Sequence, residues 1–229
     1  MEGSLRSVWQ IIALTALISI PAECQGIWME APASNYVEAA GKGDFRAQYY
    51  LAGCFFNGDG VQKDLKAAVD LLLKSAKQGY APAEYNIGIY YRDGVGLRKD
   101  LAAGLQWIRL AADQGFPNAL NSMALHYDQG RGVPKDIAIS RKYCMAAAEA
   151  GHVDAMFNLA GFYHDGNGVP KDEGMRYVWM KCAAIFGDKE AGETVKTLMT
   201  QFDPAKLKEQ NQKAYTLGNS IYPKSKKGW

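Results

Sequence analysis

The sequence has 229 residues, of which 48% are hydrophobic and 22% are charged, and its formal net charge is +2. This is the composition of an ordinary globular chain, long enough for one or two domains. So small a positive charge does not predict nucleic-acid binding, which needs a concentrated basic face to displace counterions from the phosphates.

Residues 1–24 have the pattern of a secretory signal peptide. Arg6 precedes a mostly apolar run from Val8 to Ile20. A run of 13 residues is short for a membrane span, which needs roughly 20, so a cleaved leader is expected, with no stable span in the mature chain. This predicts a periplasmic or secreted bacterial protein. A lipid anchor on Cys24 is the alternative, but the charged Glu23 stands where such sites need a small side chain.

Residues 45–188 repeat the same residue types every 36 residues, four times over. A period between about 20 and 50 residues is typical of solenoid repeats, in which each unit buries its apolar face on its neighbours. In the first copy the recurring residues are Ala47, Gly58, Gly60, Lys63, Asp64, Ala76 and Gly79.

Each copy predicts two helices. Ala47, Leu51 and Phe55, and their equivalents in the later copies, are spaced i, i+4, i+8 and therefore share one helical face. The Gly-x-Gly pair ends this first helix, because glycine tolerates the positive φ of a C-terminal cap. The aspartate that follows, such as Asp136, is expected to cap the N-terminus of the second helix.

The segments on either side predict incomplete units, as the ends of a repeat array require. Residues 25–44 are interpreted as an N-terminal half-repeat or cap, and residues 189–218 as a partial repeat followed by a capping helix. Residues 219–229 are expected to form a basic, disordered tail. The residues expected to cover the last apolar face are Leu207, Ala214 and Leu217.

The cysteines beyond the leader, Cys54, Cys144 and Cys182, lie at unrelated positions of the repeat. A repeat family held together by disulfides would place its cysteines in pairs at matching positions. Free core thiols are therefore expected, and only a bridge between Cys144 and Cys182 of adjacent units stays open.

The loop and the end of the second helix resemble the Sel1-like repeat, a relative of the tetratricopeptide repeat. Gly-Val-Pro-Lys-Asp at residues 132–136 and Ala-Ala-Glu-Ala-Gly at residues 147–151 carry the resemblance, which covers roughly residues 33–200. It implies an all-α fold, an α/α right-handed superhelical solenoid of helix-turn-helix repeats that serves as a protein-binding scaffold. Arg176 departs from the pattern, because the family prefers a small residue there.

The resemblance also implies a binding surface for another protein or peptide. In related helical repeats, partners bind the concave groove that the first helices line, at positions beside the buried stripe. Asparagine can both donate and accept hydrogen bonds there, and tyrosine offers rigid contact area. By register, the predicted groove residues are Tyr49, Tyr50, Phe56, Tyr85, Asn86, Ile89, Arg92, Asn121, Leu125, Asp128, Phe157, Asn158 and His164.

Three common catalytic motifs are absent from the sequence. No serine is followed by a lysine three residues later, and there is no Gly-x-Ser-x-Gly or His-Glu-x-x-His. His126 and His164 lie on first helices of adjacent units but two positions out of register, which favours a structural or groove role over metal ligation. We therefore expect a protein that is not an enzyme and that uses no cofactor or metal.

Two alternatives remain, and the first of them belongs to a different class of protein. Some secreted, cysteine-rich relatives of this repeat are linked to β-lactam binding or hydrolysis, so a cell-wall-related enzyme or β-lactam-binding protein is the second hypothesis. An assay with nitrocefin or labelled penicillin would test it. A eukaryotic luminal adaptor is the third, and leader processing in a bacterial against a microsomal system would separate it from the first.

Overall fold

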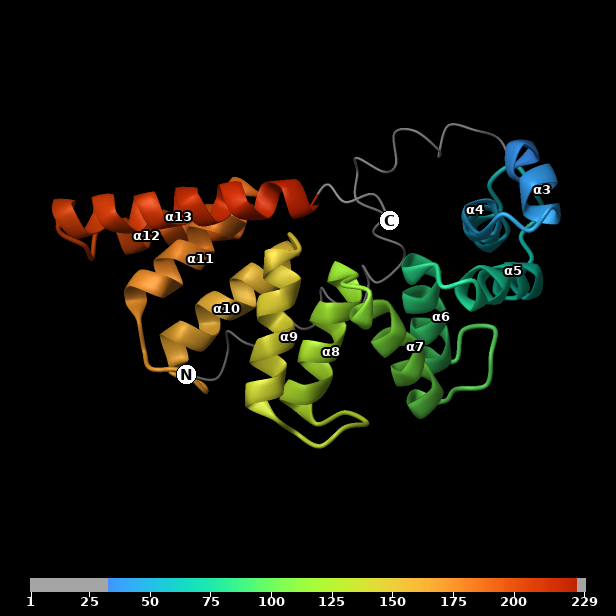
Figure 1. The fold of residues 1–229 in the computed structure, drawn as a ribbon, viewed down its shortest axis with the longest axis horizontal. Coiled ribbons are helices and arrows are strands. Elements are labelled where there is room, and N and C mark those ends of the chain that lie inside the picture. The colour runs from blue at the N-terminus through green and yellow to red at the C-terminus, as the bar shows by residue number, and fades with distance from the viewer. Residues whose placement is uncertain (1–32, 226–229) are drawn as a thin grey trace. The chain divides into compact units, whose positions relative to one another are not determined.

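The computed structural model describes residues 33–225, so the predicted leader lies outside the described residues. This part of the chain contains eleven α-helices and no strand (Figure 1). Its contacts divide it into two compact units, one that ends at Gln78 and one that begins at Gly79. The prediction of an all-α fold of consecutive helix-turn-helix repeats is confirmed. None of the described helices combines the length and the apolar character that a membrane crossing requires.

The first unit consists of a short helix followed by a helical pair. Helix α4 packs on both of its neighbours. Tyr36 and Ala40 from the short helix and Ala47 and Leu51 from α4 form the core between them. The short helix thus covers the first full repeat. The helices of this unit are α3 (Ser34–Gly41), α4 (Phe45–Asn57) and α5 (Leu65–Lys77).

The second unit contains three helical pairs and two further helices. Each helix from α6 to α11 packs on the next one along the chain, and buried apolar side chains from all eight helices form one continuous core. The pairs are α6 (Ala81–Asp93) with α7 (Leu101–Asp113), α8 (Pro117–Gln129) with α9 (Ile137–Glu149), and α10 (Val153–Asp165) with α11 (Glu173–Ile185). The remaining two are α12 (Lys189–Met199) and α13 (Pro204–Ser225).

The loop inside each repeat ends one helix and begins the next as predicted. The first glycine of each loop adopts a left-handed conformation at the C-terminus of the first helix, and the aspartate accepts a hydrogen bond from the backbone N–H three residues further on. Each such N-cap stabilises the fold by about 1 kcal/mol. The glycines are Gly58, Gly94, Gly130 and Gly166, and the aspartates are Asp64, Asp100, Asp136 and Asp172.

The second glycine of the loop has a packing role that sequence reasoning missed. A Cβ on Gly132 would lie 2.6 Å from a methyl carbon of Leu105 and 2.9 Å from one of Leu101, both on α7. A Cβ on Gly168 would lie 3.0 Å from a methyl carbon of Ile137, where α9 begins. The loop of one repeat therefore packs on the second helix of the preceding repeat, and a side chain would hold the two apart.

Helices α6 and α7 approach each other at a pair of glycines. A Cβ on Gly104 would lie 2.7 Å from the carbonyl oxygen of Gly88, and a Cβ on Gly88 would lie 2.8 Å from the carbonyl oxygen of Gly104. Real Cβ atoms do not come so close to backbone atoms, so the two backbones are in direct contact here. Glycine is the residue that permits this approach.

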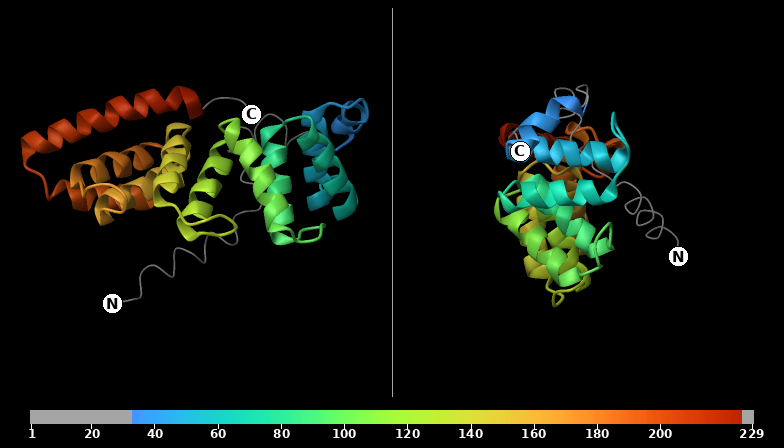
Figure 2. Two further views of the ribbon diagram at one scale, coloured as in Figure 1. Left: turned by 60° about the horizontal axis from the view of Figure 1, so that its bottom comes forward. Right: turned by 90° about the vertical axis from the view of Figure 1, so that its right-hand side faces the viewer.

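The structure corrects the prediction for the C-terminal segment. Instead of giving way to a disordered tail after Gly218, helix α13 continues to Ser225. Ile221 accounts for the extra turns, because its side chain is completely buried in the core of the second unit. Helix α13 packs on α11 and also reaches α9 (Figure 2). Ala214 is buried and both Leu207 and Leu217 pack against the core, as predicted.

Cys144 and Cys182 are buried free thiols, so the bridge that the sequence left open is not formed. Each lies near a backbone carbonyl oxygen, with Sγ 3.3 Å from that of Ala155 for Cys144 and 3.6 Å from that of Ala214 for Cys182. Burial raises the pKa of both thiols to about 12. They are core residues without reactive thiolate character.

Candidate interaction surface

Most of the predicted groove residues of the second unit keep part of their surface open to solvent. They lie on α6, α8 and α10, which are the first helices of three successive repeats, and all except Leu125 share a repeat position with another member. These residues are called the first-helix surface below. Its members are Tyr85, Asn86, Arg92, Leu125, Asp128, Phe157, Asn158 and His164.

Two predicted residues do not belong to this surface. Ile89 is only 7% exposed and Asn121 only 8%. Ile89 is part of the main apolar core. The register identified the correct helices for both residues, but neither offers a partner enough surface to bind. We therefore remove both from the candidate site.

The predicted residues of the first unit are aromatic side chains held by other aromatic or cationic groups. The ring of Tyr50 stacks on that of Tyr36 of α3, with centroids 5.7 Å apart, and Tyr49 meets Tyr50 edge to face at 5.4 Å. Phe56 carries the ammonium group of Lys63 over its ring at 5.7 Å. All three predicted residues are half-buried. Their rings are therefore fixed by packing and still partly accessible.

In the second unit, rings and amides stand side by side on the first helices. Tyr85 and Phe157 occupy the same repeat position, and each is followed directly by an asparagine, Asn86 and Asn158. The ring of Tyr85 packs against that of Phe116, with centroids 5.6 Å apart. Burial raises the pKa of the Tyr85 hydroxyl, which is therefore neutral at physiological pH.

The C-terminal end of α6 carries a charged pair. Arg92 donates from two nitrogens to the two carboxylate oxygens of Asp93, at 2.8 and 2.7 Å. These hydrogen bonds lower the pKa of Asp93 and raise that of Arg92, so both groups are ionised at neutral pH. The charges of both residues also act on His126 of α8.

Two of the histidines have structural roles. His126 is buried, and burial lowers its pKa. The neutral ring lies with Nδ1 2.7 Å from the carbonyl oxygen of Arg131, to which its N–H donates. His152 caps α10, where its Nδ1 accepts a hydrogen bond from the N–H of Ala155 at 3.3 Å. For His126, the sequence favoured a structural or groove role over metal ligation.

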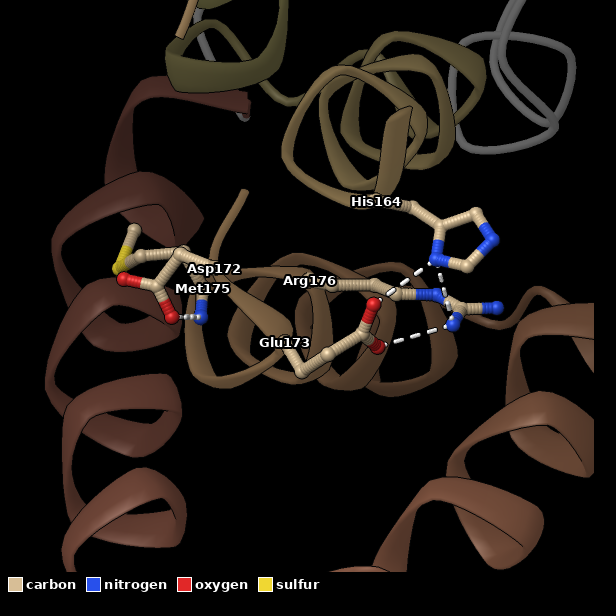
Figure 3. Close-up of polar contacts among 5 residues, drawn as sticks. All are labelled: His164, Asp172, Glu173, Met175 and Arg176. Carbon is tan, nitrogen blue, oxygen red and sulfur yellow. Dashed lines mark hydrogen bonds and ion pairs between the residues drawn. The ribbon is translucent and has the colours of Figure 1, made fainter. Parts of the chain in front are cut away.

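His164 is exposed at the end of α10 and joins two residues of α11 (Figure 3). Its Nδ1 lies 2.8 Å from Oε1 of Glu173 and 3.0 Å from a guanidinium nitrogen of Arg176. That guanidinium also donates to Oε2 of Glu173 at 2.9 Å. Partial burial acts to raise the pKa of Glu173, but the hydrogen bonds with His164 and Arg176 hold it below its usual value.

This cluster explains how Arg176 is accommodated at a position where the family pattern has a small residue. Its side chain pairs with Glu173 and His164 at the edge of the α10–α11 pair (Figure 3). The spacing of Glu173 and Arg176 by three residues on one helix was visible in the sequence. Their link to His164 was not, because it depends on how α10 and α11 pack.

Within residues 33–225, no group of three or more histidine, cysteine, aspartate or glutamate side chains is arranged to hold a metal ion. What the first-helix surface offers instead is a row of rings, amides and single charges of both signs. Such a set can contact a peptide and exchange hydrogen bonds with its backbone.

A family model of the Sel1 repeat matches four successive stretches of the chain, residues 45–80, 81–116, 117–152 and 153–185. No curated protein matches the chain. Among solved structures, a Sel1 repeat protein from Oxalobacter formigenes is 33% identical with a TM-score of 0.68, and the match covers 72% of this chain and 48% of that one.

Two further structures are similar. The protective antigen c5321 of uropathogenic Escherichia coli, which displays an SLR fold, is 26% identical with a TM-score of 0.69, covering 85% of this chain and 48% of that one. The immunity protein PA5088 from Pseudomonas aeruginosa is 21% identical with a TM-score of 0.55, covering 82% and 74%, which is a likeness of fold alone. The chain spans about half the length of the first two structures.

Proposed function

Because the chain belongs to the Sel1 repeat family, we propose that it is a scaffold that binds another protein or a peptide along its first-helix surface. Sel1 repeat proteins are generally protein-interaction scaffolds. In this proposal the partner lies in a concave groove and crosses successive first helices.

The observation that supports the proposal most is the repetition of a half-buried ring followed by a half-buried amide. Tyr85 with Asn86 and Phe157 with Asn158 present this pair on α6 and α10. A ring that is already packed gives contact area with little loss of side-chain entropy, and an amide can serve both the N–H and the C=O of an extended peptide. Neither group needs a particular side chain on the partner.

The charges on the first-helix surface favour a protein partner over a polyanion. Arg92 and Asp128 occupy equivalent positions on α6 and α8 and are opposite in sign. Phosphate backbones require a run of positive charge. Charges of opposite sign instead set the register of a partner by complementarity and reject wrong partners.

A photocrosslinking experiment tests the proposal. p-Benzoylphenylalanine is placed at Asn86 or, as the control, at Leu110, which is 48% exposed on α7, a second helix. We expect a protein adduct in the native host from position 86 and none from position 110. The partner identified by mass spectrometry should then bind the N86A/N158A variant at least tenfold more weakly than the L110A variant in calorimetric titrations. Equal crosslinking or equal affinities would refute the assignment of the surface.

We also propose that the protein is exported to the periplasm or secreted, on the pattern of Arg6 and the apolar run from Val8 to Ile20. Fusion of residues 1–24 to a phosphatase that is active only after export is expected to give activity and a shortened product. Replacing Ile12 and Leu14 with aspartate should abolish both. An active fusion that keeps its full length would indicate an anchor instead of a cleaved leader.

We do not propose the β-lactam alternative, because that hypothesis rests on a likeness to relatives that are rich in cysteine. Cys144 and Cys182 are buried free thiols, and the described cysteines do not staple the helices of each repeat. A nitrocefin assay of the purified chain is expected to show no turnover above buffer.

A further inference from the structure

A second candidate binding site lies at the far end of the repeat array from α6, in an open pocket of about 370 Å³ between α11 and α13. None of its residues belongs to the first-helix surface. This volume is at the small end of the range for ligand pockets, which suits one or two side chains of a peptide. The lining residues are Lys181, Ile185, Lys208, Asn211, Gln212 and Tyr215.

The charged lining of the pocket is entirely positive. Lys181 and Lys208 contribute ammonium groups, and no carboxylate is among the described residues that line it. Neither ammonium group has an ion-pair or hydrogen-bond partner within residues 33–225. On the same helix as Lys208, by contrast, Lys206 and Lys213 both pair with Glu209. The pocket is thus a place where an incoming anion meets two unpaired cations.

An amide donor lies beside the lysines. The side-chain oxygen of Asn211 accepts a hydrogen bond from the hydroxyl of Tyr177 at 2.8 Å, and Tyr177 is fully buried. This bond fixes the orientation of the amide and leaves its N–H₂ group to donate elsewhere. A carboxylate can accept from the amide N–H₂ and pair with the ammonium groups.

The remaining wall is apolar and exposed. Ile185 is 54% exposed and Tyr215 is 63% exposed, which is unusual for large apolar side chains within residues 33–225. Their surfaces stand next to the cationic groups, and the pocket that they share is hollow. A concave site can accept a protruding side chain of a partner. A site that binds a bilayer instead needs apolar side chains that protrude from the protein into the lipid. The shape of the site therefore favours a peptide segment over a lipid surface.

We propose that this pocket binds an acidic, apolar peptide segment of a partner protein. One carboxylate of the segment pairs with Lys181 and Lys208 and accepts from the amide of Asn211, and an adjacent aliphatic or aromatic side chain packs on Ile185 and Tyr215. The site is separate from the first-helix surface, so it gives the scaffold a second point of attachment.

The test uses three fluorescein-labelled hexapeptides and the purified chain in fluorescence anisotropy titrations. The first is Gly-Glu-Leu-Phe-Glu-Gly, the second replaces both glutamates with glutamine, and the third replaces leucine and phenylalanine with alanine. We expect saturable binding of the first peptide, weakening as salt rises, and at least tenfold weaker binding of the other two. This ranking requires both the charge and the apolar wall.

Matched variants then assign the binding to the pocket. The K181E/K208E variant should bind the first peptide at least tenfold more weakly, whereas K66E/K142E, with the same charge change at exposed lysines of α5 and α9, should bind it like the wild type. Y215S is a second pocket variant in case the double variant fails to fold, which its circular-dichroism melt would reveal. Y215S should also lower affinity.

Several outcomes would overturn the proposal. They are no binding of any peptide at 1 mM, equal binding of the first and second peptides, equal effects of the two charge-reversal variants, or binding to vesicles of anionic phospholipid without binding to the first peptide. Because the N86A/N158A variant alters no residue of this pocket, it should bind the first peptide normally. The two sites can therefore fail independently.

Discussion

Replacing Gly104 with alanine should destabilise the second unit, although alanine is the better helix former. The new Cβ would lie 2.7 Å from the carbonyl oxygen of Gly88 and 2.9 Å from the backbone nitrogen of Arg92. Neither atom is the end of a flexible side chain, so α6 and α7 must move apart. Overpacking of this kind costs about 1–3 kcal/mol, and the helix propensity of alanine returns about 1 kcal/mol. The expected net loss is about 1 kcal/mol.

Gly161→Ala is the matched control. Gly161 lies inside α10, and apart from the adjoining residues and the backbone of its own helix, a Cβ built on it meets no atom within 4 Å. The propensity gain should therefore appear alone, stabilising the protein by about 0.5–1 kcal/mol. The same chemical change thus has opposite signs at two helical positions, and the sign depends only on what the methyl group meets.

Urea denaturation followed by circular dichroism measures both changes as shifts of the midpoint at constant slope. We expect a lower midpoint for G104A and a higher one for G161A. Native-state hydrogen exchange should also show faster exchange of α6 and α7 amides in G104A. A G104A variant as stable as the wild type would contradict the close approach of α6 and α7, and a destabilised G161A would contradict the open space around α10.

Three further outcomes are expected. Asp136→Ala removes the N-cap of α9 and should lower the free energy of unfolding by about 1 kcal/mol. The control, Asp113→Ala, should not lower it, because Asp113 lies at the C-terminal end of α7, where a negative charge interacts unfavourably with the helix dipole. Urea titrations compare the two variants. In a variant whose other cysteines are serine, Cys144 and Cys182 should react with Ellman's reagent at pH 8 only after unfolding, because burial raises the pKa of both to about 12; rapid reaction of the native chain would show that they are accessible. Burial lowers the pKa of His152 in the folded chain. In the unfolded chain this histidine has its ordinary pKa of about 6.5, so as the pH falls it binds a proton before the folded chain does. The free energy of unfolding should therefore fall as the pH drops from 7 to 5. His152→Asn keeps an N-cap and should reduce that pH dependence in thermal melts; an unchanged slope would assign it to other groups.

The elements of the repeat were predictable because each is specified by nearby residues that recur. Gly130 and Asp136 show their roles within one loop, since a C-cap needs a left-handed residue and an N-cap needs a side-chain acceptor. The same signals appear in all four copies. The Sel1 resemblance was carried by these local residues.

What escaped prediction depends on contacts between distant segments. Gly132 looked like part of a helix cap, and only the structure shows Leu101 and Leu105 pressed against it. Ile221 follows Gly218 in a lysine-rich segment that reads as a tail, yet the core of the second unit has a place for it and extends α13. Local composition does not contain that information.

The candidate site divides in the same way. The repeat register placed Asn86 and Asn121 on first helices correctly. How far each side chain is buried depends on the neighbouring repeats, which bury Asn121. The pocket of Lys181 and Lys208 was beyond reach, because it exists only when α13 packs against α11. No spacing in the sequence connects those two lysines.

Helix α13 affects how the repeat array unfolds. Stacked repeats ordinarily fray from their ends, one unit at a time, because each touches only its neighbours. Since α13 packs on α11 and also reaches α9, it ties the third repeat to the fourth. Melting of either repeat removes part of the packing that holds α13 in place, and so weakens the contacts of α13 with the other repeat. The C-terminal half of the second unit is therefore expected to open as one cooperative block.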